Sequence, residues 1–231
     1  MPLNITAISF GISTILAVFI TARAYLSWKK QEDNQVGKNY FYAMLFVSSY
    51  FSVRAIASFL FFNSAIALTV AYILSHVFVA FACAFFVKFT VVILIGTPSE
   101  NLLFYLTLFL FAIYLIFNII FLNNPHFNYE LNVIEWGINK YVGIFYAILG
   151  WLVFLSVAAS LIYKAVQNWT NNIVRIRCLL MAGSALLTIF VLIPRNISPA
   201  PSLILVSDIG FAISLGLIFL SMNYKGKEEK K

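Results

Sequence analysis

Residues 65–87 read AIALTVAYILSHVFVAFACAFFV, a stretch without a single Asp, Glu, Lys or Arg. Crossing the hydrocarbon core of a bilayer takes roughly 20 predominantly apolar residues as an α-helix. This stretch therefore predicts a membrane-spanning helix, and stretches of the same kind recur on both sides of it. The predicted spans are residues 5–28, 39–62, 65–87, 101–122, 141–163, 176–194 and 201–223.

Composition supports an integral membrane protein with a single domain over residues 1–231. Of the 231 residues, 62% are hydrophobic and 10% are charged, and the mean hydropathy is +0.95. A soluble domain contains about 45–50% apolar and about 25% charged residues. Two cysteines, Cys83 and Cys178, fall in different spans, so the sequence predicts neither a disulfide framework nor a metal site, and no cofactor is expected.

Lysine and arginine positions predict the orientation of the all-α, seven-helix bundle. Of the 15 Lys and Arg residues, 12 fall on one side if the amino terminus is outside. Basic loops stay cytoplasmic, so we expect the amino terminus outside and the carboxyl terminus in the cytoplasm, in a multi-pass cell-membrane protein. The net charge of +7 is spread over span ends, which favours membrane lipids over nucleic acid as partners.

The longest predicted loop, residues 123–140, lies outside in this topology. Apolar and aromatic residues alternate in it from Phe127 to Val133, and Trp136 follows. Alternation predicts a small β-hairpin that caps the bundle. An aromatic loop at the membrane interface explains the pattern equally well.

Few ionisable residues lie inside the spans, and each of them needs a partner or access to water. Arg54 is about eight residues from the outer end of its span, a depth of roughly 12 Å, and Asp208 is roughly 10 Å deep. A guanidinium and a carboxylate at matching depth predict an ion pair. His76, roughly 16 Å deep, is placed to extend this network.

Other polar and aromatic residues are predicted to converge on Arg54. Tyr50 and Ser58 lie one helical turn on either side of it. The span 141–163 contributes Tyr146 and Trp151 from its outer half. The predicted ligand-binding residues of an outward-facing pocket are Tyr50, Arg54, Ser58, His76, Tyr146, Trp151 and Asp208. A purely structural lock between the spans 39–62 and 201–223 explains Arg54 and Asp208 nearly as well. Small residues such as Ser184, Gly210 and Ser214 are explained by close helix packing.

Several protein classes are disfavoured by what the spans contain. The span 201–223 has no lysine, which excludes a covalently bound retinal there. One Asp and one His within the membrane do not supply a nucleophile with its base, a carboxylate pair or a metal cluster. We therefore do not expect an enzyme.

The layout resembles the seven-helix amino-terminal sensor region of bacterial and archaeal membrane histidine kinases. The features that carry the resemblance are the basic loop after the first span, the short turn before residue 65, Asn123-Asn124-Pro125-His126, the approach from Trp136 to Tyr141, Arg175 with Arg177, and Asp208-Ile209-Gly210-Phe211-Ala212. It implies a sensor in signal transduction that binds a small molecule. The chain ends eight residues after Asn223 without an effector, so a separate cytoplasmic signalling partner or a homodimer is expected.

Two other function classes stay open. A small transporter or carrier subunit would also use a central polar site, and a structural subunit of a membrane complex would need none. Transporter helices are often interrupted near the midplane, whereas the prolines here lie at span ends, which favours the sensor slightly. The ligand itself is not indicated by the sequence.

Overall fold

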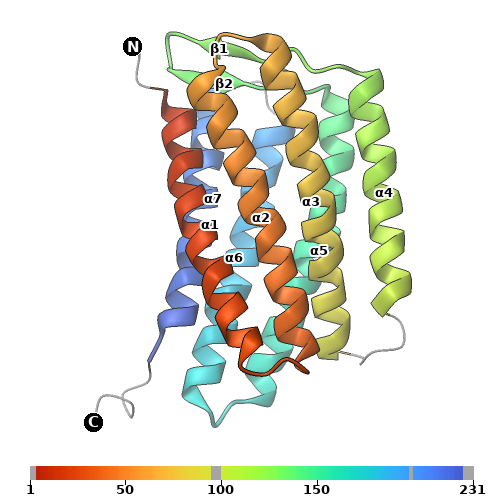
Figure 1. The fold of residues 1–231 in the computed structure, drawn as a ribbon, viewed down its shortest axis with the longest axis vertical. Helices are drawn as coiled ribbons and strands as arrows, with labels where there is room; N and C mark the ends of the chain where they lie inside the picture. Colours follow the sequence, from red (N-terminus) through yellow and green to blue (C-terminus); the bar gives the residue numbers. More distant parts are fainter. Residues whose placement is uncertain (1–3, 95–99, 198–199, 226–231) are drawn as a thin grey trace.

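The computed structural model describes residues 4–94, 100–197 and 200–225, apart from the side chains of 193–197 and 201. It is an all-α bundle in which seven helices of the described chain are long and apolar enough to cross a membrane (Figure 1). This confirms the predicted fold class of a multi-pass membrane protein. The helices are α1 (Ile5–Lys29), α2 (Gln35–Leu60), α3 (Ala65–Leu94), α4 (Glu100–Ile120), α5 (Lys140–Gln167), α6 (Asn172–Ile197) and α7 (Pro201–Asn223).

Several helices are longer than the predicted spans. α3 continues to Leu94, so Lys88 lies within the helix and not after it, and α5 continues to Gln167. Apolar counting finds the part of a helix that lies in hydrocarbon, whereas polar turns beyond it are invisible to the count. The predicted break at residues 96–99 lies outside the described residues.

Asparagines set the starts of four helices. The side-chain oxygens of Asn4, Asn34, Asn139 and Asn171 each accept a hydrogen bond from a backbone N–H in the first turn, at 3.0 to 3.1 Å. Such caps satisfy donors that have no partner inside the helix. α7 begins instead with Pro201, whose missing N–H costs nothing at a helix start.

The bundle is arranged as two sets of neighbouring helices that close against each other. α1, α2 and α3 pack in sequence order, α5, α6 and α7 do the same, and α1 also packs against α7. α4 lies at the edge of the bundle (Figure 1), where it contacts α3 and α5. Its buried residues, Thr107, Phe111, Tyr114 and Asn118, recur every three to four positions and form one face.

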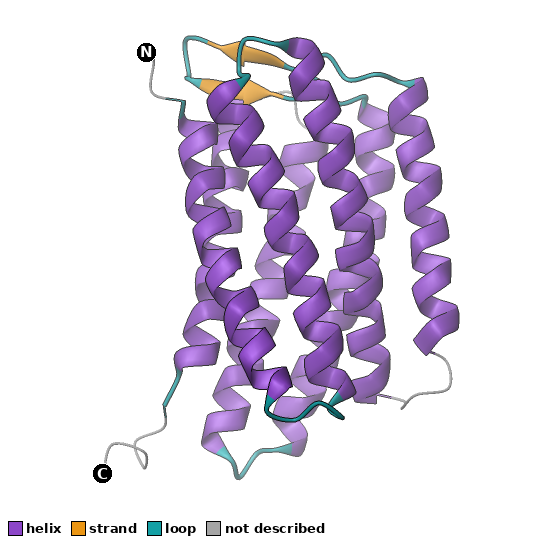
Figure 2. Cartoon of the chain, in the orientation of Figure 1, coloured by secondary structure: helices purple, strands orange, loops and turns teal. Residues whose placement is uncertain are grey.

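A two-stranded hairpin covers the end of the bundle at which α1 begins (Figure 2). β1 (His126–Asn128) pairs antiparallel with β2 (Val133–Glu135). Of the two interpretations of this loop, the hairpin is therefore confirmed. The burial follows the predicted alternation only in part, because Phe127 and Val133 are buried whereas Tyr129 and Leu131, in the turn between the strands, are exposed.

The first turn of α1 holds the hairpin in place. The Ile5 N–H donates to the Asn132 carbonyl oxygen at 2.9 Å, and the Ile134 N–H donates to Thr6 Oγ1 at 3.0 Å. These bonds fix the position of Trp136, one residue beyond β2, above the helices.

α6 and α7 approach each other closely at Gly210. A Cβ added at Gly210 would overlap the side chain of Val191, whereas one added at Gly216, on the same helix, meets nothing within 4 Å. The close packing predicted for Gly210 is therefore present, and it brings the two helices together near the middle of the bundle.

Replacing Gly210 with alanine is expected to lower the thermal stability of the protein in detergent. Overpacking of this kind costs roughly 1–3 kcal/mol. Gly216→Ala is the matched control and is expected to be neutral or slightly stabilising, because alanine is the better helix former. Equal unfolding temperatures for the two variants would contradict the close contact.

Candidate functional site

Arg54 is buried in the half of α2 nearer the hairpin, with only 1% of its surface exposed. Its Nε–H donates to Ser75 Oγ at 2.8 Å, and the Ser75 hydroxyl in turn donates to the Tyr72 carbonyl oxygen at 2.8 Å. The guanidinium carbon lies 3.8 Å from the ring centroid of Trp136 and 4.4 Å from that of Tyr72. A desolvated cation–π contact of this kind is worth about 2 kcal/mol or more. The buried cation is thus held by α3 and by the residue that follows β2.

The expected direct ion pair between Arg54 and Asp208, both of them described residues, is not formed. Between described residues, ion pairs within 4 Å join Lys29 with Glu32, Lys88 with Glu100, and His126 with Glu135. Asp208 is buried on α7, with 2% of its surface exposed. The pairing was inferred from matching depth, but depth does not fix the direction in which a side chain leaves its helix.

His76 lies within a cage of four tyrosines. The ring centroids of Tyr72, Tyr146, Tyr114 and Tyr50 are 4.2, 5.0, 5.4 and 6.2 Å from its imidazole. Nδ1 is 2.8 Å from the Tyr72 carbonyl oxygen, which only accepts, so we assign the proton to Nδ1. The 3.4 Å approach of Arg54 Nη2 to the same nitrogen is then a contact between two donors and not a hydrogen bond.

A small polar cavity of about 10 Å³ lies beside these groups. That volume holds about one water molecule. Its lining residues are Tyr50, Arg54, Tyr72, His76, Ile138, Tyr146, Leu192 and Phe211. The structure therefore brings together four of the seven predicted site residues: Tyr50, Arg54, His76 and Tyr146.

The other three predicted residues do not line this cavity. Ser58 is buried one turn towards the hairpin, where its carbonyl oxygen accepts from Asn4 Nδ2 at 2.7 Å. Trp151 is 41% exposed, and its indole N–H donates to the Ile189 carbonyl oxygen of α6 at 3.2 Å. It lies on the surface of α5 and does not line this cavity. Asp208, although buried, is not among the lining residues.

We call Arg54, His76 and the side chains that contact them the polar cluster. Four of its residues were not predicted from the sequence as site residues: Tyr72, Ser75, Tyr114 and Trp136. Tyr72 and Ser75 precede His76 by four and one positions, and Tyr72 shares its helical face, a spacing that was available in the sequence. Tyr114, whose hydroxyl lies 3.1 Å from that of Tyr72, comes from the peripheral helix α4. Trp136 was assigned to the hairpin, but its position over Arg54 depends on the tertiary structure.

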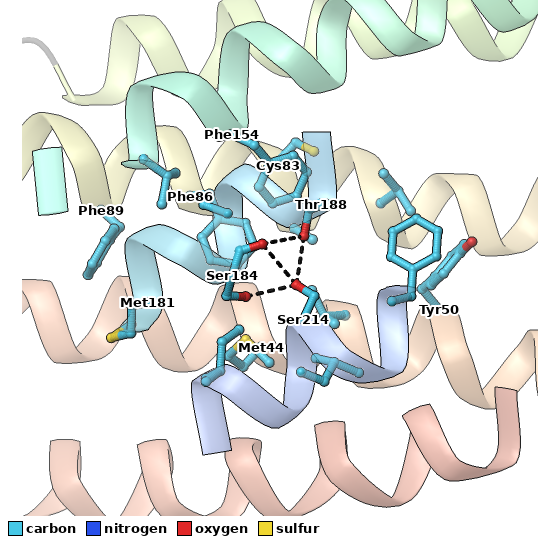
Figure 3. A pocket seen from close by; sticks show the side chains of 18 of the residues that line it. Met44, Tyr50, Cys83, Phe86, Phe89, Phe154, Met181, Ser184, Thr188 and Ser214 are labelled. Atoms are coloured by element: carbon cyan, nitrogen blue, oxygen red, sulfur yellow. Dashed lines mark hydrogen bonds between the residues drawn. The ribbon is translucent and has the colours of Figure 1, made fainter. Parts of the chain in front are cut away.

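A larger cavity of about 100 Å³ lies in the middle of the bundle and is lined by residues of α2, α3, α5, α6 and α7 (Figure 3). Tyr50, Tyr146, Leu192 and Phe211 line both cavities, so these four side chains lie between the small polar cavity and the central cavity. Most of the lining is apolar, as in small-molecule sites generally. Typical members of the lining are Met44, Phe51, Cys83, Phe86, Val157 and Met181.

Three hydroxyl groups interrupt the apolar lining of the central cavity. Ser214 Oγ of α7 lies 2.8 Å from Ser184 Oγ and 2.8 Å from Thr188 Oγ1, both on α6 (Figure 3). Thr188 and Ser214 each lie 3.0 Å from the Ser184 carbonyl oxygen. We call these three residues the hydroxyl triad. From the sequence, Ser184 and Ser214 were explained by helix packing alone.

Metal binding has no support in the described part of the chain, where no three His, Cys, Asp or Glu side chains form a group. Comparison of the chain with family models, with characterised proteins and with solved structures finds no match. The fold and the two cavities therefore define the protein as a seven-helix membrane bundle with a buried polar cluster above an apolar central cavity.

Removing the Ser75 hydroxyl is expected to destabilise the protein through Arg54. Ser75→Ala leaves the Arg54 Nε–H without its partner, and a hydrogen bond to a charged group is worth about 1.5–3 kcal/mol. Ser160→Ala is the matched control, because Ser160 is equally buried and also donates to a carbonyl oxygen three residues earlier, but does not contact a charge. Thermal unfolding in detergent is the measurement, and equal losses in the two variants would contradict the role assigned to Ser75.

Proposed function

We propose that the protein is a membrane sensor module that binds a small ligand in the central cavity and signals through a separate partner. The observation that supports this proposal is a cavity of about 100 Å³ lined by five helices. Among the described residues that line it, none is charged. A cavity with this lining suits a mainly apolar molecule and is unsuited to a charged solute.

The central cavity is a better ligand site than the polar cluster predicted from the sequence. The space beside Arg54 fits about one water molecule, and Trp136 lies over the guanidinium. The polar cluster is then the outer wall of the site. Tyr50 and Tyr146 contribute aromatic surface to the ligand cavity.

Signalling would proceed through α6 and α7, which form one wall of the cavity. Two arginines contact the carboxyl-terminal end of α7. Arg23 of α1 donates to the Asn223 side chain. Arg177 of α6 donates to the Tyr224 carbonyl oxygen at 2.8 Å. A ligand shifts an equilibrium only if it binds one helix arrangement better than another. A ligand between α6 and α7 would do so by changing their separation, which these arginine contacts would report at the end of the helix.

The proposed topology places the hairpin outside and the arginine contacts in the cytoplasm. The distribution of lysine and arginine along the chain supports this orientation. The proposed location is the cell membrane of a bacterium or archaeon. A reporter fused after residue 231 is expected to read cytoplasmic, and a reporter inserted in the turn between β1 and β2 is expected to read external. The reverse pattern would invert the topology and place the arginine contacts on the outer side.

Filling the central cavity is expected to abolish ligand binding. Val157→Phe replaces a small side chain of the lining with a bulky aromatic one, whereas Val166→Phe makes the same change at a position of α5 that is 60% exposed. Decane is the probe, and native mass spectrometry of delipidated protein is the measurement. We expect one bound decane in the wild type and in Val166→Phe, and none in Val157→Phe. Equal binding by the two variants would place the probe elsewhere.

The sensor is distinguished from a passive binder by the reactivity of Cys178. The chain has two cysteines, and Cys83 lines the cavity and is kept; labelling of Cys178, near the start of α6, is therefore followed separately by peptide mass spectrometry. Decane is expected to change the rate of maleimide labelling about threefold or more, and to have no effect when Val157→Phe is also present. Bound decane with an unchanged rate would contradict signalling through α6.

A further inference from the structure

The hydroxyl triad is a polar patch half-way along an otherwise mainly apolar cavity. In Figure 3 it lies between Phe89 and Met181 at one end and Tyr50 at the other. Along α6, the lining extends from Met181, before the triad, to Leu192, beyond it. At 1.5 Å per residue, hydrocarbon-lined space continues for roughly 5 Å on each side of the hydroxyls.

Helix packing alone does not account for the triad. Other buried hydroxyls in the bundle, such as those of Ser160 and Ser221, donate to carbonyl oxygens of their own helices. In the triad, by contrast, Ser214 bonds from α7 to both hydroxyls of α6, and all three residues line the cavity. Close packing of α6 and α7 is already provided by Gly210 against Val191.

Counting protons shows which chemistry the triad leaves available. Each hydroxyl has one proton and two lone pairs. The distances allow Ser184 to donate to Ser214, Ser214 to donate to Thr188, and Thr188 to donate to the Ser184 carbonyl oxygen. All three protons are then used inside the network, and an unused donor in apolar surroundings would be costly. Only lone pairs of the hydroxyl oxygens remain unused. The triad can therefore accept a hydrogen bond from a ligand without losing one of its own, but it can donate one only by breaking a hydrogen bond inside the network.

We infer that the ligand of the central cavity is a small apolar molecule with a hydroxyl group flanked by hydrocarbon on both sides, and that this hydroxyl donates to the triad. A hydroxylated acyl chain and a small terpenoid alcohol share this chemistry. The inference rests on the proposed function, because it requires a ligand in this cavity. It adds the position and the donor character of the polar group.

Three ten-carbon probes test the inference: 5-decanol, 5-decanone and decane. They fill space similarly, but only the alcohol has a proton to donate. Competition measured by native mass spectrometry of delipidated protein is expected to show that 5-decanol binds about tenfold more tightly than 5-decanone. The isomer 1-decanol, with its hydroxyl at the chain end, is expected to bind more weakly than 5-decanol. Equal binding of alcohol and ketone, or of the two alcohols, would overturn the inference.

Two variants tie the preference to the triad. Ser214→Ala removes the hydroxyl that bonds to both of the others, and Thr188→Val removes a hydroxyl without changing the shape of the side chain. Each is expected to reduce the preference for alcohol over ketone, measured as a ratio within the same variant, to about twofold or less. Ser221→Ala, on α7 but outside the cavity lining, is the control and keeps the full preference.

The outcomes separate this inference from the proposed function. If none of the probes binds, or if Val157→Phe does not prevent binding, the central cavity is not the ligand site and both proposals fail. If all probes bind equally and Val157→Phe prevents binding, the cavity site holds and the inferred donor group is wrong. Retention of the alcohol preference in both Ser214→Ala and Thr188→Val would likewise overturn the role of the triad and leave the cavity site standing.

Discussion

The half of the bundle nearer the hairpin depends on the burial of one guanidinium. A cation inside a membrane bundle is costly unless its surroundings replace the water it has lost. For Arg54 the replacement comes from Ser75 and Tyr72 on α3, and from Trp136 beyond the hairpin. The complete set of contacts forms only when α2, α3 and the hairpin are all in place. The hairpin is in turn bonded to the start of α1, so the burial of one charge couples three helices and the cap.

The two cavities have different character because different side chains divide the bundle between them. Tyr50 and Tyr146 contribute to both, and tyrosine combines a large apolar ring with one polar group. On the side of these tyrosines nearer the hairpin, guanidinium, imidazole and hydroxyl groups fill the space almost completely. On the other side, mainly apolar side chains leave the central cavity of about 100 Å³, whereas the cavity beside the guanidinium measures about 10 Å³. The charged group and the open space are therefore in different parts of the bundle. A ligand in the central cavity would contact the hydroxyl triad and not Arg54.

Sequence reasoning predicted the architecture because lipid leaves few choices. Backbone groups in hydrocarbon must be bonded within the segment, so each long apolar run becomes a helix. The inward placement of Arg54 follows from the same constraint, and Tyr50 and Tyr146 were identified with it. The Arg54–Asp208 pair was wrong because equal depth leaves the rotation of each helix undetermined. The exposed position of Trp151 on α5 likewise follows from a helix rotation that the sequence does not determine. The central cavity was not predictable, because a void depends on how unequal side chains from five helices meet.

The cost of the central cavity bears on whether it is a packing defect. Helices in lipid associate through van der Waals contact and hydrogen bonds, without the hydrophobic effect that drives soluble domains together. An empty apolar cavity forfeits such contacts, at about 24 cal/mol per Å³, or about 2 kcal/mol for a volume of this size. The chain contains 24 phenylalanines, and the lining still includes small residues such as Ala82 and Ala185 where larger side chains would fill the space. A bundle that depends on contact for its stability and yet keeps this volume open gains the missing contacts when an apolar ligand occupies it.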